Sequence, residues 1–253
     1  MDGVKSGVIK QAAVTRVESG KVELEGGEEL TADFIVMATG GPAYNFPMGA
    51  DGVPFETYKE LLKEAQQTVG AASSILIVGG GPVGVEMAGE IKAAHPDKDV
   101  TIVNSGTKLL SAAVAPLNDR LVTSIMRQLE ALGVRVVLGA RLAEIPPPPE
   151  GPVKTAIRPT PGATFALSNG ESVSADLVFV ATGPSAVKPA GADLLPEGAV
   201  DGSTGLIKVN EYFLVDGMDG VFAIGDCTNI RETKMAYLAG LHTPFVVKNL
   251  MQL

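Results

Sequence analysis

The stretch Ile75-Leu76-Ile77-Val78-Gly79-Gly80-Gly81-Pro82-Val83-Gly84-Val85-Glu86 decides the fold of this chain. An apolar run of the kind that forms a buried strand leads into Gly-x-Gly-x-x-Gly and then into a sequence typical of a helix. Gly79 permits the tight turn, Gly81 lets the backbone approach a pyrophosphate, and Gly84 lets the helix pack close to the strand. Because the first N–H groups of such a helix favour phosphate, the stretch predicts a dinucleotide-binding loop. Its candidate cofactor-binding residues are Gly79, Gly80, Gly81, Pro82, Val83, Gly84 and Glu86.

Strand and helix patterns alternate around this loop. Leucines and an isoleucine spaced three and four residues apart between Leu117 and Leu132 predict one face of a helix. The whole series is a βαβαβ pattern with a parallel sheet, as in mononucleotide-binding folds. The expected helices are 56–69, 82–94 and that leucine-rich segment, and the expected strands are 75–78, 100–103 and 134–138.

The residue that discriminates between nucleotides should lie ~20 positions after the loop, at the end of the second strand. That place holds Asn104 and Ser105, with neither an acidic residue for a ribose hydroxyl nor an arginine for a 2′-phosphate. Both side chains are neutral donors that suit either ribose, so NADH and NADPH both remain candidates.

A repeat of fourteen residues frames the glycine loop. Residues 27–40 recur as residues 170–183 at a constant offset of 143, and seven of the fourteen positions are identical. Each copy reads as a turn and a buried strand followed by Ala-Thr-Gly, and each is preceded by an alternating apolar–polar hairpin. The shared ends add six candidate cofactor-binding residues: Ala38, Thr39, Gly40, Ala181, Thr182 and Gly183.

The last third of the chain predicts short strands at 207–209, 212–215 and 221–224 and a helix at 234–247, broken near Pro244. The last strand ends in Gly225-Asp226, and the helix would begin at Lys234-Met235-Ala236. Between the two halves of the chain, the proline-rich run 145–152 reads as a stiff surface connection, because proline cannot join a central ladder. A polyproline ligand is the alternative interpretation of that run.

Composition excludes several classes of function. The net charge of −9 comes without a basic cluster, which argues against nucleic acid as a partner. The single cysteine, Cys227, leaves no Cys pair for dithiol chemistry. With His95 and His242 as the only histidines, we expect no metal site. No apolar run approaches the ~20 residues of a membrane-spanning helix, and we expect a reducing, cytoplasmic setting.

The order Ala-Thr-Gly, Gly-x-Gly-x-x-Gly-x-Glu, Ala-Thr-Gly, Gly-Asp resembles the pyridine nucleotide-disulfide oxidoreductase superfamily of flavoproteins. Residues 79–92 and 234–242 are similar to segments of the ferroptosis suppressor protein family, the homologues of apoptosis-inducing factor. The resemblance implies an α/β fold in which a Rossmann-like NAD(P)-binding domain is inserted in a partial FAD-binding domain. It implies that Asp226 accepts a hydrogen bond from a flavin ribityl hydroxyl and that Glu86 and Lys234 act near the flavin, Glu86 alternatively being a solvent-facing helix residue.

The resemblance also sets the expected domains. Residues 1–45 and 186–253 form the partial FAD-binding domain, 46–70 a connecting segment with a helix, and 71–185 the NAD(P)-binding domain. The family has an earlier glycine loop for the FAD pyrophosphate and a later C-terminal region, so this sequence resembles a chain shortened at both ends.

The activity implied is FAD-dependent: hydride passes from NADH or NADPH to FAD and on to a quinone-type acceptor. Cofactor residues implied in the partial FAD-binding domain are Gly225, Asp226, Lys234, Met235 and Ala236. The resemblance is compatible with peripheral membrane association through parts that this sequence does not contain. A chain that binds NAD(P)H without flavin or turnover is the alternative, and a DNA-binding factor is disfavoured by the net charge.

Overall fold

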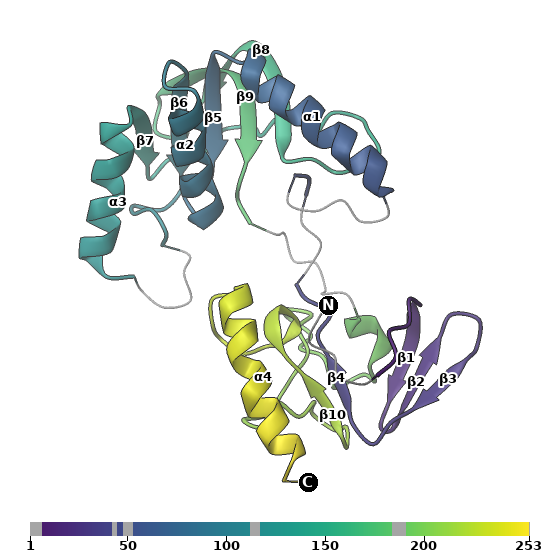
Figure 1. Ribbon diagram of the computed structural model, residues 1–253. Coiled ribbons are helices and arrows are strands. Elements are labelled where there is room, and N and C mark those ends of the chain that lie inside the picture. Colours follow the sequence, from purple (N-terminus) through teal and green to yellow (C-terminus); the bar gives the residue numbers. More distant parts are fainter. Residues whose placement is uncertain (1–6, 42–44, 48–52, 112–116, 184–190, 253) are drawn as a thin grey trace. The chain divides into compact units, whose positions relative to one another are not determined.

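The computed structural model describes residues 7–41, 45–47, 53–111, 117–183 and 191–252. The chain divides into two compact units (Figure 1). One unit holds residues 43–185, and the other combines residues 1–42 with 186–253. The second unit is therefore discontinuous in sequence, with the first inserted in it.

The unit of residues 43–185 is built on a five-stranded sheet with the order β7-β6-β5-β9-β8. Neighbouring strands run parallel except for β8, which pairs antiparallel with β9. The glycine loop follows β5, the central strand. The strands are β5 (Ser74–Val78), β6 (Asp99–Asn104), β7 (Val134–Leu138), β8 (Ile157–Ala166) and β9 (Ser172–Val180), and the helices are α1 (Phe55–Ala71), α2 (Pro82–Ala94) and α3 (Asp119–Ala131).

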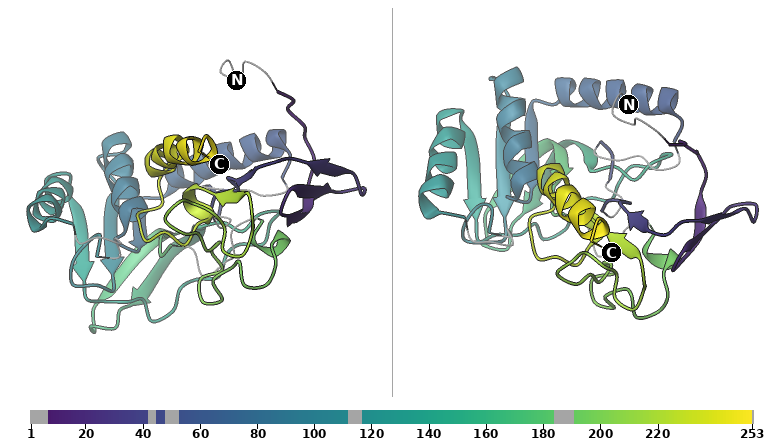
Figure 2. Two further views of the ribbon diagram at one scale, coloured as in Figure 1. Left: turned by 90° about the horizontal axis from the view of Figure 1, so that it is seen from below. Right: turned by 60° about the horizontal axis from the view of Figure 1, so that its bottom comes forward.

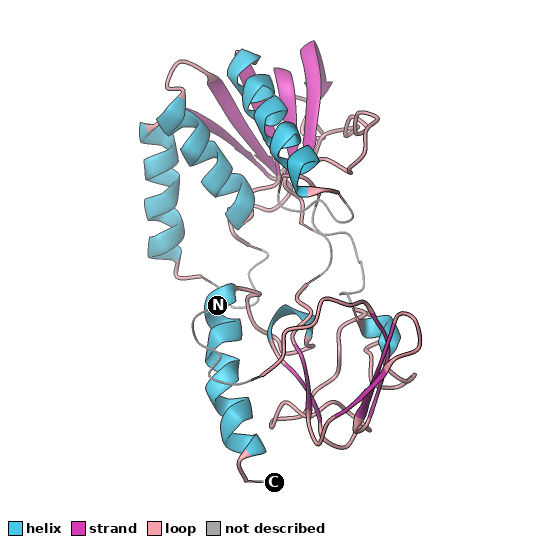
Figure 3. Ribbon diagram, turned by 45° about the vertical axis from the view of Figure 1, so that its right-hand side comes forward, coloured by secondary structure: helices cyan, strands magenta, loops and turns pink. Residues whose placement is uncertain are grey.

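Successive side chains of β5 point to opposite faces of the sheet, so the core of this unit consists of two clusters. Ile75 and Ile77 face a cluster that also takes in apolar residues of α1, α2 and α3. Leu76 and Val78 face the opposite cluster, formed with residues of β9 and the hairpin that leads into it. The three helices therefore cover one face of the sheet (Figure 3). Because both faces are buried, the strand is apolar along its whole length.

The helix α1 belongs to the core of this unit. Tyr58, Leu61 and Leu62 pack against the helix-side cluster, as do Ala65 and Val69. The helix that we expected in the connecting segment 46–70 thus packs on the sheet of this unit.

The described part of the discontinuous unit contains two small sheets and one long helix. A three-stranded antiparallel sheet consists of β1 (Val14–Glu18), β2 (Lys21–Leu24) and β3 (Glu29–Thr31). A two-stranded parallel sheet pairs β4 (Ile35–Met37) with β10 (Val221–Ala223). Figure 2 shows α4 (Ala236–Leu250), in yellow, beside the segment that follows β10, where the short helix η2 (Gly225–Cys227) lies; a second short helix is η1 (Ala192–Leu194).

The prediction of strands at 207–209 and 212–215 was wrong. Ile207, Val209, Leu214 and Val215 make only isolated bridges. The side chain of Asn210 accepts hydrogen bonds from the backbone N–H groups of residues 212 and 214, at 2.9 and 3.1 Å. These bonds close a turn, and a turn held by a side chain takes the place of a ladder.

The break expected near Pro244 was also wrong, because α4 continues through Pro244 to Leu250. Proline removes one helical N–H, and the carbonyl that loses this partner belongs to Gly240. Gly240 is exposed, so water can hydrogen-bond to that carbonyl. The helix also begins at Ala236, two residues after Lys234.

The leucine-rich helix begins later than its pattern suggested. Asn118 is the N-cap of α3, and its side-chain oxygen accepts a hydrogen bond from the Arg120 N–H at 2.9 Å. Leu117 therefore precedes the helix, and Leu129 is its buried residue. Because Leu121 is exposed, only part of the predicted face packs on the sheet.

Candidate functional site

Two glycines of the loop are required by the fold itself. Gly79 has φ +116°, and a Cβ atom there would lie 2.4 Å from the carbonyl oxygen of Ala181. A Cβ atom on Gly84 would lie 2.0 Å from the carbonyl oxygen of Gly79. Both approaches involve backbone atoms that cannot move aside, so glycine is needed for the turn and for the packing of α2.

Gly80 is held by the segment that follows β6. Its N–H donates to Asn104 Oδ1 at 3.1 Å, and its carbonyl accepts from the Leu110 N–H at 2.8 Å. A Cβ atom on Gly80 would lie 2.5 Å from Leu109 Cδ2 and 2.9 Å from Asn104 Cγ. The middle of the loop is therefore fixed by contacts between two strand ends.

Gly81 differs from its neighbours. It adopts ordinary extended backbone, with φ −74° and ψ −178°, and no atom of the described residues would lie within 4 Å of a Cβ placed there. It is the N-cap of α2, and no side chain caps the helix. The free amides of the first turn thus face open space at Gly81, which fits the close approach of a pyrophosphate.

We expected Asn104 to contact a ribose. In the structure its side chain makes hydrogen bonds to the backbone around the glycine loop. Besides accepting from Gly80, it donates through Nδ2 to the carbonyls of Gly106 and Lys108, at 3.1 and 3.0 Å. Both amide hydrogens are thus used in bracing the loop. Ser105 is exposed, and the Lys108 ammonium pairs with Asp119 at 2.9 Å.

Each unit has one Ala-Thr-Gly segment, and each segment follows a strand that pairs in parallel with a neighbouring strand. β9 neighbours β5, and the Ala181 N–H donates to the Val78 carbonyl at 2.8 Å, so Ala181, Thr182 and Gly183 begin beside the glycine loop. In the other unit β4 neighbours β10, which brings Ala38, Thr39 and Gly40 to the same edge as Gly225 and Asp226.

The Gly225-Asp226 turn forms the start of η2. Gly225 has φ +72°, and a Cβ atom on it would lie 3.2 Å from the Cβ of Ala239 in α4. The half-buried Asp226 side chain makes no hydrogen bond to any described residue. A carboxylate free to accept at a glycine turn fits the ribityl end of a flavin, as the resemblance implied. The chain has one Gly-x-Gly-x-x-Gly loop, which we assign to NAD(P)H. The chain's residues therefore fit the ribityl end of a flavin at this turn and supply no second glycine loop for the FAD pyrophosphate.

The Lys234 ammonium is directed into its own loop. It donates to the carbonyls of Thr228 and Ile230, at 2.8 and 3.0 Å. Burial lowers the pKa of Lys234, while Glu232 and Asp226 oppose that shift. Met235 and Ala236 are exposed at the start of α4, which no side chain caps.

Cys227 is packed beneath this turn. It is fully buried, and its Sγ lies 3.1 Å from the Ile224 carbonyl oxygen. Burial raises the pKa of the Cys227 thiol, which makes it a poor nucleophile. Glu86, in contrast, is exposed on α2 and makes no hydrogen bond to a described residue, so its side chain is open to a ligand.

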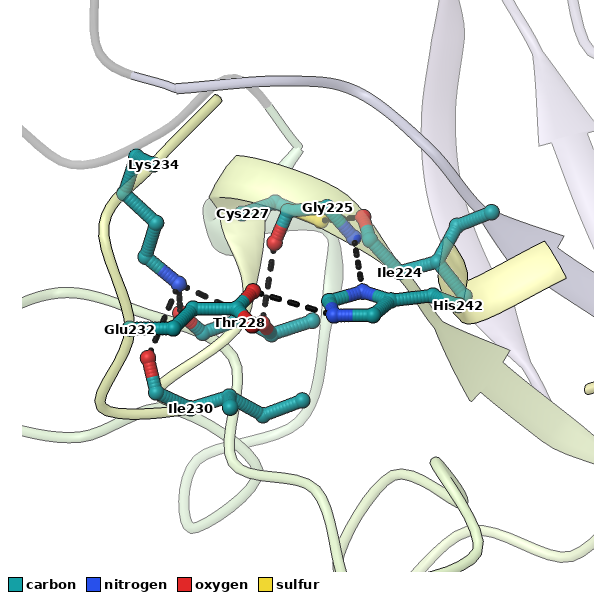
Figure 4. Close-up of polar contacts among 8 residues, drawn as sticks. All are labelled: Ile224, Gly225, Cys227, Thr228, Ile230, Glu232, Lys234 and His242. Carbon is teal, nitrogen blue, oxygen red and sulfur yellow. Dashed lines mark hydrogen bonds and ion pairs between the residues drawn. The ribbon is translucent and has the colours of Figure 1, made fainter. Parts of the chain in front are cut away.

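Two residues with a place in this site were not expected there. His242 accepts a hydrogen bond from the Gly225 N–H at 3.0 Å and contacts Glu232 (Figure 4). No spacing pattern in the sequence marks this pair, because the turn and the helix come together only in three dimensions.

The family model described as pyridine nucleotide-disulphide oxidoreductase matches residues 2–240. The chain therefore belongs to this family, whose members use FAD and NAD(P)H. It is 32% identical over 256 residues to ferroptosis suppressor protein 1 of Taeniopygia guttata, a match that covers 96% of this chain and 62% of that protein. To apoptosis-inducing factor homolog B of Dictyostelium discoideum it is 31% identical, with 97% of this chain and 64% of that protein covered.

The chain thus spans about three fifths of the length of these curated relatives. Among solved structures it resembles an NAD-dependent persulfide reductase from A. fulgidus, with a TM-score of 0.65 and 23% identity over 94% of this chain and 44% of that one. That likeness concerns the fold. It confirms the expected α/β class with Rossmann-like domains.

The described ranges contain no group of three His, Cys, Asp or Glu side chains that could hold a metal ion. Within the same ranges, every helix is too short or too polar to cross a membrane.

Proposed function

We propose that this chain binds NAD(P)H at the glycine loop and part of an FAD at the Gly225-Asp226 turn, as part of a flavin-dependent NAD(P)H oxidoreductase. When bound, FAD supplies two-electron redox chemistry between NAD(P)H and a second acceptor. Membership of the family and the two glycine turns support the proposal.

The observation that carries the proposal is the open space at Gly81. The fold explains why residues 79, 80 and 84 lack side chains, since a Cβ at each would collide with neighbouring atoms. It does not explain Gly81, where a Cβ would meet nothing among the described residues and the backbone is unstrained. A ligand that must approach this backbone explains it, and a pyrophosphate at the helix N-terminus is such a ligand.

The residues have separable tasks. The first-turn amides of α2 hold the pyrophosphate, while Asn104 keeps the loop in shape by its three hydrogen bonds. Asp226 accepts hydrogen bonds from hydroxyl groups of the flavin side chain. The exposed carboxylate of Glu86 is open to a ligand beside the glycine loop, and, in the other unit, the uncapped start of α4 at residues 234–236 contributes to binding FAD. We propose both NADH and NADPH as substrates, since the expected ribose position, residues 104 and 105, holds neutral side chains.

The substitution Gly81→Ala tests the nucleotide site. Its methyl group fits the free fold, so the free energy of unfolding should stay within about 0.5 kcal/mol of the unaltered chain. NADH and NADPH affinity, measured by titration calorimetry, should fall at least about tenfold. The matched control is Gly89→Ala in α2, where a Cβ also meets nothing within 4 Å and nucleotide affinity should not change. Unchanged affinity in Gly81→Ala contradicts the nucleotide site.

A visible spectrum tests the flavin. The purified chain, supplied with FAD and freed of excess, should absorb in the blue and oxidise NAD(P)H. A colourless chain that still binds NAD(P)H favours the second candidate, a nucleotide-binding module without turnover. The single glycine loop of this sequence is the observation in favour of that candidate.

The acceptor that we propose is a quinone, because the relatives include ferroptosis suppressor proteins and the chain has no cysteine pair for dithiol transfer. Oxidation of NAD(P)H that depends on a soluble quinone would support this, and turnover confined to oxygen would argue against it. We also propose a cytoplasmic location, since the lone cysteine suits a reducing compartment.

A further inference from the structure

Helix α4 reaches the Gly225-Asp226 turn through a buried histidine. His242, in the second turn of α4, is 6% exposed, and its ring packs against that of Phe213, with centroids 4.7 Å apart and planes tilted by 50°. Figure 4 shows the ring between Gly225 on one side and the Glu232 carboxylate on the other. The histidine is thus enclosed by the turn, the loop after it and an aromatic ring.

The two ring nitrogens of His242 have different tasks. Nδ1 accepts a hydrogen bond from the Gly225 N–H at 3.0 Å, and an accepting nitrogen carries no proton. The proton of the neutral ring is therefore on Nε2, which lies 3.0 Å from Glu232 Oε1. A carboxylate beside Nε2–H fixes which nitrogen is protonated and how the ring is turned.

With the hydrogen bond to His242, both backbone polar groups of Gly225 have a partner. The carbonyl of Gly225 accepts from the N–H and the hydroxyl of Thr228, at 3.2 and 2.9 Å. Its N–H has His242 as its partner, and its φ of +72° is a conformation that a glycine occupies but does not strongly prefer. The preceding residue, Ile224, is tied to the Met37 carbonyl at 3.0 Å. The direction in which Asp226 leaves the turn depends on these bonds.

Asp226 is the one member of this turn whose side chain is left open. Its neighbours Gly225 and Cys227 are buried and bonded within the fold, whereas the Asp226 carboxylate is half-buried and makes no hydrogen bond to a described residue. A fixed backbone beside a free carboxylate is the arrangement expected of a preorganised ligand contact.

We propose that His242 is a positioning residue for flavin binding: through Nδ1 it holds Gly225 so that Asp226 presents its carboxylate to the hydroxyl groups of FAD, and Glu232 keeps the ring in the accepting form. This inference rests on the proposed function. It assigns to a residue of α4, sixteen positions after Asp226 in the sequence, control over the affinity of the flavin contact.

Three substitutions separate the hydrogen bond from the packing. His242→Asn places a carbonyl oxygen where Nδ1 lies and cannot reach Glu232. His242→Gln reaches toward Glu232 and has no acceptor at the Nδ1 position. His242→Phe keeps a ring packed against Phe213 and loses both polar contacts.

The measurement is the dissociation constant for FAD, from quenching of flavin fluorescence. His242→Gln and His242→Phe should weaken binding about tenfold, the effect of one lost hydrogen bond. His242→Asn should stay within about threefold of the unaltered chain, since the acceptor is restored. The inference is overturned if the Asn variant binds as weakly as the Gln variant, or if all three bind as the unaltered chain does.

A second measurement needs no substitution. Nitrogen NMR of the free, unaltered chain should show Nδ1 of His242 unprotonated and the Gly225 amide protected from hydrogen exchange. A protonated Nδ1, or a rapidly exchanging Gly225 amide, overturns the inference whatever the variants do. Failure of the unaltered chain to take up FAD is a different result: it overturns the proposed function and this inference with it.

Discussion

The two copies of the repeat, residues 27–40 and 170–183, begin from similar sequences and end in different structures. In the second copy, residues 172–180 form the single strand β9, which pairs with β5 on one side and β8 on the other. In the first copy the same length is divided between β3 and β4, which belong to different sheets. The shared sequence encodes a turn, an apolar run and Ala-Thr-Gly, while the neighbouring strands decide how much of the run becomes a buried strand.

The two copies also differ in how deeply their side chains are buried. Leu177 is 1% exposed in the second copy, and its counterpart Phe34 is 39% exposed in the first. Asp176 accepts four hydrogen bonds, from the N–H groups of Ser73, Ser74 and Gly162 and from the Ser74 hydroxyl. Its counterpart Asp33 is exposed and makes no hydrogen bond through its side chain to a described residue. The second copy is a core element, whereas the first is an edge.

The largest expected contrast is in core packing. Leu177→Ala should lower the free energy of unfolding by about 2–5 kcal/mol, because it leaves a cavity in a sheet buried on both faces. Phe34→Ala should cost about 1 kcal/mol, since Phe34 is exposed and meets Phe222 in an edge contact. Urea unfolding followed by circular dichroism measures both. Equal losses would contradict the distinction between core and edge.

A smaller contrast depends on pH. The hydrogen bonds from Gly162 and Ser74 lower the pKa of Asp176, so the folded state favours its charged form. This stabilisation is present above the unfolded-state pKa of about 3.9 and is lost as the pH falls through the lower folded-state pKa. Asp176→Asn should therefore be less stable than the unaltered chain at neutral pH, and the gap should narrow in acid.

Thermal unfolding between neutral pH and about pH 3 checks this prediction. Asp33→Asn is the matched control, and its stability should follow that of the unaltered chain across the same range. A gap for Asp176→Asn that stays constant down to the lowest pH would contradict the role given to its carboxylate.

The smallest expected contrast is at the last position of each copy. Gly40 and Gly183 have φ of +77° and +84°, and a Cβ on either would meet nothing within 4 Å among the described residues. Alanine at either position should cost about 1–2 kcal/mol through backbone strain alone. The two losses in urea unfolding should be alike. A much larger loss at one position would show that the Ala-Thr-Gly turns are not equivalent.

Local signals in the sequence were sufficient for several elements. The strand β7 and the helix α2 have the predicted bounds, 134–138 and 82–94. A proline at the first helical position, a histidine–proline stop and an apolar run ended by glycine are local features, and each acts within a few residues. The glycine loop was predicted on the same basis.

Two expectations failed because a local side-chain hydrogen bond or the exposure of a carbonyl, rather than the pattern of residue types, decided the local structure. A turn held by Asn210 replaced two strands, and an exposed Gly240 allowed α4 to pass Pro244. The contact between Asn104 and a ribose, inferred from its distance from the loop in sequence, stays a prediction. The structure shows its amide shared among Gly80, Gly106 and Lys108, a set of partners that spacing alone does not predict.

The sequence by itself determined that this chain holds a dinucleotide-binding loop between two Ala-Thr-Gly strands, because glycine spacing and apolar periodicity act over short distances. Only the tertiary structure decided which glycine of that loop is free of the fold, how differently the two repeats are buried, and that His242 meets Gly225. Those facts depend on atoms far apart in the chain, and their positions follow from the packing of whole strands and helices.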